Sequence, residues 1–171
     1  MAPKATGVER RTLHFGTFDD AKAEARRLLK GPYARAGEWS LGQNCEHLAA
    51  FMRYSLDGFP KKLLPWPINA LLRRVALRES FFRKPMPAGL PTAPFLKPSV
   101  VETPAGETAS RADAEAVERF CRECDRVAER QAAGGRFEPS PIFGEMRGDL
   151  WPRVHLKHAE LHLGHIVPVT P

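Results

Sequence analysis

The sequence predicts an all-α protein, a four-helix bundle with one long proline-rich crossover between the second and third helices. Three observations favour this fold. Four segments place apolar residues at helical spacing, most of these segments begin at a residue that can cap a helix, and no segment alternates polar and apolar residues convincingly. The chain of 171 residues, 43% hydrophobic and 27% charged, is expected to form a single domain over residues 1–171.

The first two helices have start and stop signals. The first is expected to begin at Thr17, whose hydroxyl can accept a bond from the first turn, and to end at Gly31-Pro32. The second is expected to begin at Ser40, which forms a Ser-x-x-Gln capping box with Gln43, and to end at Asp57-Gly58. Each carries an apolar stripe and should bury one face.

The last two helices are predicted from similar signals. The third is expected to begin at Ser110, with Asp113 at its third helical position, and to end at Gly134-Gly135. The fourth is expected to begin near Asp149 and to stop before Pro168.

Residues 58–110 form the expected crossover, since they contain nine of the sixteen prolines. Within them, residues 68–83 fit a short amphipathic helix. Residues 61–84 carry seven basic residues and one acid, so the net charge of this segment equals the net charge of the whole chain, +6. We favour a basic helix that packs on the bundle with its arginines in water. The alternatives are a surface for an anionic cosubstrate and a docking helix for a membrane or a partner. Because the charge is local and no nucleic-acid-binding motif is present, no nucleic acid partner is expected.

The remaining composition is typical of a cytoplasmic protein without a transmembrane segment. No apolar run approaches the ~18 residues of a membrane span. Three cysteines, an odd number in a chain without a secretory leader, favour a reducing compartment. Cys45, Cys121 and Cys124 are interpreted as small buried hydrophobes rather than as a redox or zinc motif. Glu46 is expected to be a solvated charge, not a general base.

One short stretch holds four of the six histidines of the chain, His155, His158, His162 and His165. On a helix these side chains share an arc of roughly 80°. Trp151 lies on the same arc, so this side is expected to face the core. Lys157, Glu160 and Leu163 are expected on the sides that face away.

A metal site would explain inward-facing imidazoles, because an imidazole buried without partners is costly. His158 and His162 are an i, i+4 pair on one helix face and can bind the same ion. Among the remaining histidines, His47 is the better third ligand, since it lies near the apolar face of a predicted helix. Three imidazoles with an open position suit zinc, nickel or iron. The alternative is that the histidines lie half-exposed along a seam of the bundle.

The stretches "EWSLGQNCEHLA", "HAELHLGHI" and "SPIFGEMRGDLWPRVHLKH" resemble the DinB/YfiT-like superfamily of metal-binding four-helix bundles, and within it a branch known only as a domain of unknown function. The resemblance spans nearly the whole chain. It implies that His47, His158 and His162 are the metal ligands. It also implies metal-dependent transfer of a small-molecule thiol such as glutathione, mycothiol or bacillithiol, or thiol-dependent isomerisation. The arginine and glutamine that often follow the late histidines are missing here, and His165 stands at the glutamine position.

Three functions therefore remain open at this point. The leading hypothesis is a metal-dependent enzyme with a low-molecular-weight thiol cosubstrate, a small-molecule substrate held in an adjacent apolar cavity, and His155 and His165 as auxiliary groups. The second is a non-catalytic metal-binding or structural bundle. The third is a membrane- or partner-docking module built on residues 68–83. A homodimer is compatible with a bundle of this size.

Overall fold

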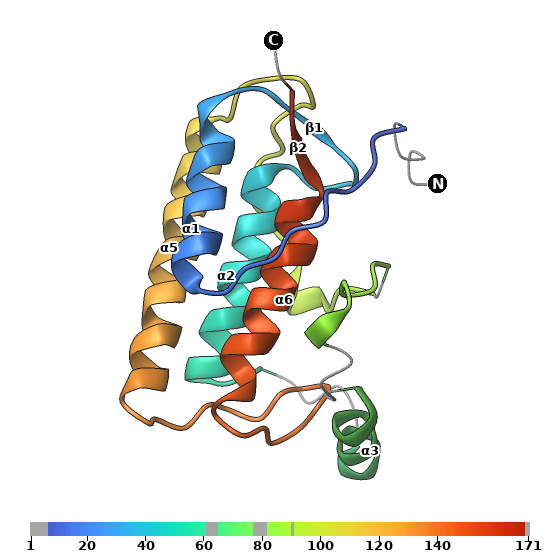
Figure 1. Ribbon diagram of the computed structural model, residues 1–171, viewed down its shortest axis with the longest axis vertical. Coiled ribbons are helices and arrows are strands. Elements are labelled where there is room, and N and C mark those ends of the chain that lie inside the picture. Colours follow the sequence, from blue (N-terminus) through green and yellow to red (C-terminus); the bar gives the residue numbers. More distant parts are fainter. Residues whose placement is uncertain (1–6, 61–64, 77–81, 90, 170–171) are drawn as a thin grey trace.

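The computed structural model describes residues 7–60, 65–76, 82–89 and 91–169, and in this part the protein is mostly helical, as predicted. Four helices lie side by side (Figure 1). They are α1 (Phe18–Arg27), α2 (Leu41–Asp57), α5 (Arg111–Ala132) and α6 (Leu150–Gly164). Helix α2 packs against both α5 and α6, and α1 packs against the same two helices.

The predicted starts of three helices are confirmed. Thr17, Ser40 and Ser110 are the N-caps of α1, α2 and α5, and each forms a capping box with the polar residue three positions on. Reciprocal bonds of this kind satisfy amides that have no partner inside the helix, which fixes where each helix begins. A short 3₁₀ helix, η1 (Leu28–Lys30), follows α1 before the chain turns at Gly31.

The all-α prediction is incomplete, because the described residues contain one pair of short strands. Strand β1 (Tyr33–Arg35) pairs antiparallel with β2 (Ile166–Pro168), and α6 ends at Gly164, before Pro168 as expected. Strands of three residues are too short to show an alternating pattern. The carbonyls at the end of α6 are satisfied by Arg11, whose backbone amide donates to Gly164 and whose guanidinium donates to Leu163 and Ile166.

Helix α6 is buried on more sides than the histidine arc alone predicts. Lys157 and Glu160, expected to face away from the core, are only 7% and 9% exposed. The reason is that the segment before α1 crosses over α6 (Figure 1). Glu160 accepts a hydrogen bond from the Phe15 amide at 3.0 Å and pairs with Lys157 at 2.7 Å. Leu163, expected on the same outer side, is fully buried.

The cysteines lie in the core, as expected. Cys45, Cys121 and Cys124 are buried and free, and they belong to the cluster that joins α2 to α5. Burial raises the pKa of the Cys121 thiol to about 11 and raises that of Cys124 further. These thiols therefore stay protonated at neutral pH and serve as packing groups.

The crossover contains a helix where one was predicted. Helix α3 (Trp66–Ala76) forms the first part of the expected 68–83 helix, whereas residues 77–81 lie outside the described residues. Further along, η2 (Pro94–Leu96) returns the chain to α2. Within the described ranges, no helix is long and apolar enough to span a membrane.

Glu46 is not the solvated charge that the sequence suggested. Its carboxylate accepts hydrogen bonds from the amides of Ser99 and Val100 and from the Ser99 hydroxyl, at 2.7 to 2.8 Å. Burial by itself would raise the pKa of Glu46, but these bonds outweigh it and the pKa is lowered. Glu46, which directly precedes His47 on α2, therefore holds the crossover against this helix by hydrogen bonds.

Candidate metal centre

The fold brings together the three histidines that the sequence singled out as ligands. His47 projects from α2, and His158 and His162 project from adjacent turns of α6. One nitrogen from each ring lies within 4.8 Å of the others. The Nε2 atoms of His47 and His158 are 3.2 Å apart, and the ring centroids of all three pairs lie 4.6 to 5.0 Å apart. Helices α2 and α6 therefore converge at one cluster of imidazoles.

One of the nitrogen–nitrogen spacings, that between His47 and His158, fits a tetrahedral ion. Nitrogens bound to zinc at roughly 2.0–2.1 Å in tetrahedral geometry are about 3.3 Å from one another. The 3.2 Å between the Nε2 atoms of His47 and His158 agrees with this separation. None of the hydrogen bonds or ring contacts of these imidazoles within the described residues involves a carboxylate.

Two of the rings are oriented by hydrogen bonds at the nitrogen that faces away from the cluster. His47 Nδ1 lies 2.8 Å from the Leu96 carbonyl oxygen, which can only accept, so this nitrogen carries the proton. His162 Nδ1 likewise lies 2.8 Å from Asn44 Oδ1. The Asn44 amide donates to the Ser40 and Trp39 carbonyls, which fixes its oxygen toward His162. Both Nε2 atoms are thereby left as bare lone pairs, the form that binds a metal.

The third ring is held by packing. His158 Nδ1 is buried and has no hydrogen-bond partner in the part of the chain that the structure describes. The Phe51 ring meets the His158 ring edge-on at 5.0 Å, and His162 meets it at 4.6 Å. With its Nε2 3.2 Å from that of His47, this ring completes a set of three imidazoles whose nitrogens lie within 4.8 Å of one another.

The electrostatics keep the cluster neutral. Burial lowers the pKa of His47, in spite of its bond to Leu96. Burial and the neighbouring imidazoles lower the pKa of His158 and His162 well below the ordinary value. All three rings are therefore uncharged at neutral pH, which is the protonation state that a metal ligand requires.

Two residues of the site, Trp39 and Asn44, were not among the candidate site residues predicted from the sequence. The Trp39 ring stacks on His162 with centroids 5.6 Å apart and lies 5.0 Å from the His47 ring, so it covers one side of the cluster. Asn44 orients His162 from one turn before His47. Its signal was its position, because an amide on the apolar face of a helix needs a buried partner.

His155 and His165 do not join the cluster. His155 is fully buried and stacks on Trp151, with its Nε2 2.9 Å from the Ser55 hydroxyl oxygen. Because the Ser55 hydroxyl donates to the Met52 carbonyl, His155 Nε2 is the donor of this bond. His165 lies at the end of α6, where its ring packs against Gly37. An auxiliary role for either residue stays a prediction.

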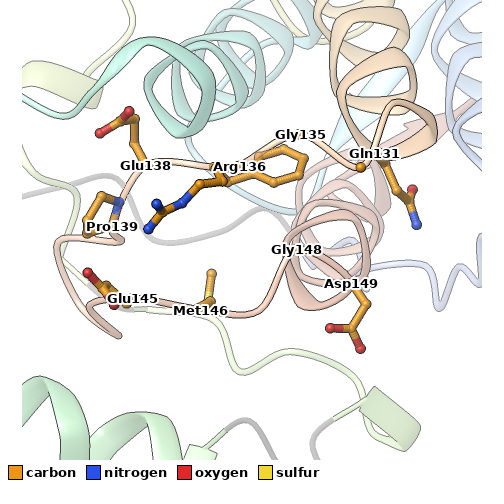
Figure 2. A pocket seen from close by; sticks show the side chains of 11 residues that line it. Gln131, Gly135, Arg136, Glu138, Pro139, Glu145, Met146, Gly148 and Asp149 are labelled. Atoms are coloured by element: carbon orange, nitrogen blue, oxygen red, sulfur yellow. The ribbon is translucent and has the colours of Figure 1, made fainter.

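The expected apolar cavity beside the histidines does not correspond to a cavity that the described residues form at one end of the bundle. That cavity, of about 690 Å³, lies between the end of α5 and the start of α6 (Figure 2). The side chains around it include Arg136, Glu138, Glu145 and Asp149. None of the three histidines lines it, so it is separate from the candidate metal centre.

Comparison with known proteins gives one match. A family model described as "Protein of unknown function (DUF1569)" covers residues 7–169. No curated protein and no solved structure matches the chain. The match agrees with the narrower part of the resemblance, a domain of unknown function, and assigns no activity to the histidine cluster.

Proposed function

The chain belongs to the DUF1569 family of proteins of unknown function, and from that premise we propose that it is a DinB-like metalloenzyme whose divalent ion is bound by His47, His158 and His162. The observation that carries the proposal is the convergence of three neutral imidazoles from two helices on one point. The side-by-side packing of α1, α2, α5 and α6, with the crossover between α2 and α5, supports a DinB-like four-helix bundle.

The ligand set supports zinc, nickel or iron as the ion. A divalent ion with three neutral ligands and one exchangeable position lowers the pKa of a thiol or water that binds there. The Leu96 carbonyl and Asn44 would hold two ligand rings in place during turnover, and Trp39 would exclude water from one side. Hydrogen bonds of this type to ligating histidines fix the ring orientation and raise ligand basicity.

The reaction that we propose is transfer of a small-molecule thiol to an electrophilic substrate, with thiol-dependent isomerisation as the related alternative. In the transfer, the thiol loses its proton, its sulfur forms a bond to a carbon of the substrate, and the leaving group departs with the bonding electrons. The support for this reaction is the resemblance to the DinB/YfiT-like superfamily together with a ligand set that leaves the charge of the ion uncompensated.

Element analysis of untagged protein tests the metal site. We expect about one divalent ion per chain, and loss of the ion in His158→Ala with the helical content retained. His14→Ala is the matched control, because His14 is exposed and lies outside the cluster. Protein without metal, or His158→Ala with its metal intact, contradicts the ligand assignment. An ion with a fourth protein ligand, such as His155 or His165, supports the non-catalytic alternative instead.

A second function is favoured by a separate observation on α3. Ile68 and Leu71 are 45% and 62% exposed, in a segment that carries the whole net charge of the chain. Exposed apolar residues among basic ones are typical of a helix that lies on an anionic membrane. Co-sedimentation with anionic vesicles tests this function. Leu71→Ser should weaken binding to the vesicles. Val101→Ser should not, because Val101 is exposed but lies outside α3. Equal binding by both variants contradicts this function.

A further inference from the structure

The carbonyl that orients His47 belongs to a segment with little structure of its own. His47 Nδ1 donates to the Leu96 carbonyl at 2.8 Å, and Leu96 is the last residue of η2, a helix of three residues in the crossover. A single 3₁₀ turn does not fix a carbonyl relative to α2, because its own hydrogen bonds are local. The orientation of this proposed ligand therefore depends on the contacts that hold the crossover against α2.

Glu46 makes three hydrogen bonds to this part of the crossover. Its Oε2 atom accepts from the amides of Ser99 and Val100, both at 2.7 Å, and its Oε1 atom accepts from the Ser99 hydroxyl at 2.8 Å. Bonds to a carboxylate are stronger than bonds between neutral groups. The Leu96 side chain is also buried in an apolar cluster, but apolar packing is non-directional and does not set where the carbonyl points.

The polar contacts with the crossover come from one face of α2. Gln43, Glu46 and His47 stand at positions i, i+3 and i+4, the spacing that places side chains on the same face of a helix. Gln43 Nε2 donates to the Val100 carbonyl at 3.3 Å, and the Glu46 carboxylate accepts from the amide of the same residue. The proposed ligand and the residue that holds the crossover are therefore neighbours on α2, and the chain from Leu96 to Val100 connects their partners.

We propose that Glu46 is a positioning residue for the metal centre. By holding the crossover, it keeps the Leu96 carbonyl against His47 Nδ1 and thereby keeps His47 Nε2 in the cluster. This inference rests on the proposed metal site and adds a linkage to it. An ion on Nε2 requires the proton of the His47 ring to be on Nδ1, which is the form that donates to the Leu96 carbonyl. The ion and the docked crossover therefore favour each other, and coupling of this kind is reciprocal.

The Zn²⁺ affinity of two Glu46 variants, measured by competition with a chromophoric chelator, tests the positioning role. Glu46→Ala should bind Zn²⁺ about tenfold more weakly, the lower end of the roughly 10- to 100-fold loss typical for a group that supports a ligating histidine, because Glu46 acts through Leu96. Glu46→Gln should retain most of the affinity, since its amide oxygen can accept from both backbone amides and its NH₂ group can donate to the Ser99 hydroxyl. Equal losses in the two variants would assign the effect to the charge of Glu46 and contradict the positioning role.

Glu118→Ala is the matched control. The Glu118 carboxylate also makes two hydrogen bonds between segments, since it accepts from Nε and Nη2 of Arg26, both at 3.0 Å. These bonds join α5 to α1, and neither helix carries a histidine of the cluster. Glu118→Ala should bind Zn²⁺ as tightly as the unsubstituted protein, and circular dichroism shows whether each variant is folded.

Hydrogen exchange in the unsubstituted protein tests the reciprocal effect. The Ser99 and Val100 amides exchange when their bonds to Glu46 open. Bound Zn²⁺ should therefore slow their exchange by about the same factor that Glu46→Ala loses in Zn²⁺ affinity. The Gly106 amide is the reference, because it lies in the same crossover but donates to the Tyr33 carbonyl, at 2.8 Å, rather than to α2. Its exchange should slow less than that of the two amides bound to Glu46.

The outcomes separate this inference from the proposed function. If the unsubstituted protein binds no Zn²⁺, the ligand assignment is wrong and this inference is wrong with it. If Zn²⁺ binds but Glu46→Ala has the affinity of Glu118→Ala, the metal site stands and Glu46 does not position it. Unchanged exchange of the Ser99 and Val100 amides on Zn²⁺ binding leads to the same conclusion. The exchange measurement decides the matter even if Glu46→Ala does not fold.

Discussion

Asn44→Ala tests how much of the metal affinity depends on the hydrogen bond that orients His162. The three ligand nitrogens themselves are unchanged in this variant. In the structure, the Asn44 side chain accepts from His162 Nδ1 at 2.8 Å and donates to the Ser40 and Trp39 carbonyls at 2.9 and 3.2 Å. Alanine removes the acceptor and leaves the buried imidazole N–H of His162 unpaired, which costs about 1–3 kcal/mol of stability.

The effect on metal binding should be of similar size. Loss of a group that hydrogen-bonds a ligating histidine typically lowers metal affinity about 10- to 100-fold. Competition with a chromophoric chelator measures this affinity, and urea unfolding of the metal-free protein measures the stability. Asn44→Asp, which keeps an acceptor for His162, should bind the ion more tightly than Asn44→Ala.

Ser55→Ala is the control for this experiment. Ser55 is also a buried polar residue of α2, but it bonds His155 rather than a member of the cluster. The Ser55→Ala variant should be less stable than the unsubstituted protein but should keep its metal affinity. If Asn44→Ala binds metal as tightly as the unsubstituted protein, or if Ser55→Ala loses affinity equally, the reasoning about ligand orientation is wrong.

Two further predictions concern stability. Burial lowers the pKa of His155 to about 3 against an ordinary value of 6.5. As the pH falls, the unfolded chain therefore binds a proton at His155 before the folded chain does. The free energy of unfolding of the metal-free protein should fall by up to about 1.4 kcal/mol per pH unit between pH 6.5 and 3. Urea unfolding across this range should show a shallower slope for His155→Phe, and equal slopes would contradict the assignment. Gly42→Ala should lower Tm, because the new Cβ would lie 2.5 Å from Asp113 Oδ1, which the Gly42 amide now contacts at 2.6 Å. Gly31→Ala, with nothing within 4 Å of its Cβ, should leave Tm nearly unchanged, and a similar loss in both would contradict the steric explanation.

The features that could be predicted from the sequence are those whose cause is local. A capping box lies within four residues, so the starts of α1, α2 and α5 could be located from the sequence. The pairing of His158 with His162 follows from the period of one helix. The placement of His47 beside them needed a second argument, namely that a histidine near an apolar face requires a partner.

The features that could not be predicted depend on segments far apart in the sequence. The strand pair β1–β2 joins residues 33–35 to 166–168, and three residues do not form a pattern. The partner of Glu160 is a backbone amide 145 positions away, so its burial could not be read from the polarity of α6. Glu46 was misjudged for the same reason, since its partners lie in the irregular crossover. Backbone partners of this kind leave no signal in side-chain chemistry.

The distance along the chain between the histidines determines when the cluster can form. His47 and His158 are 111 positions apart, yet their Nε2 atoms are 3.2 Å apart in the folded protein. During synthesis, a ribosome-bound chain that lacks α6 contains a single member of the cluster and has no site. On the proposed function, an ion could therefore bind at this cluster only after α6 has been synthesised and has packed against α2.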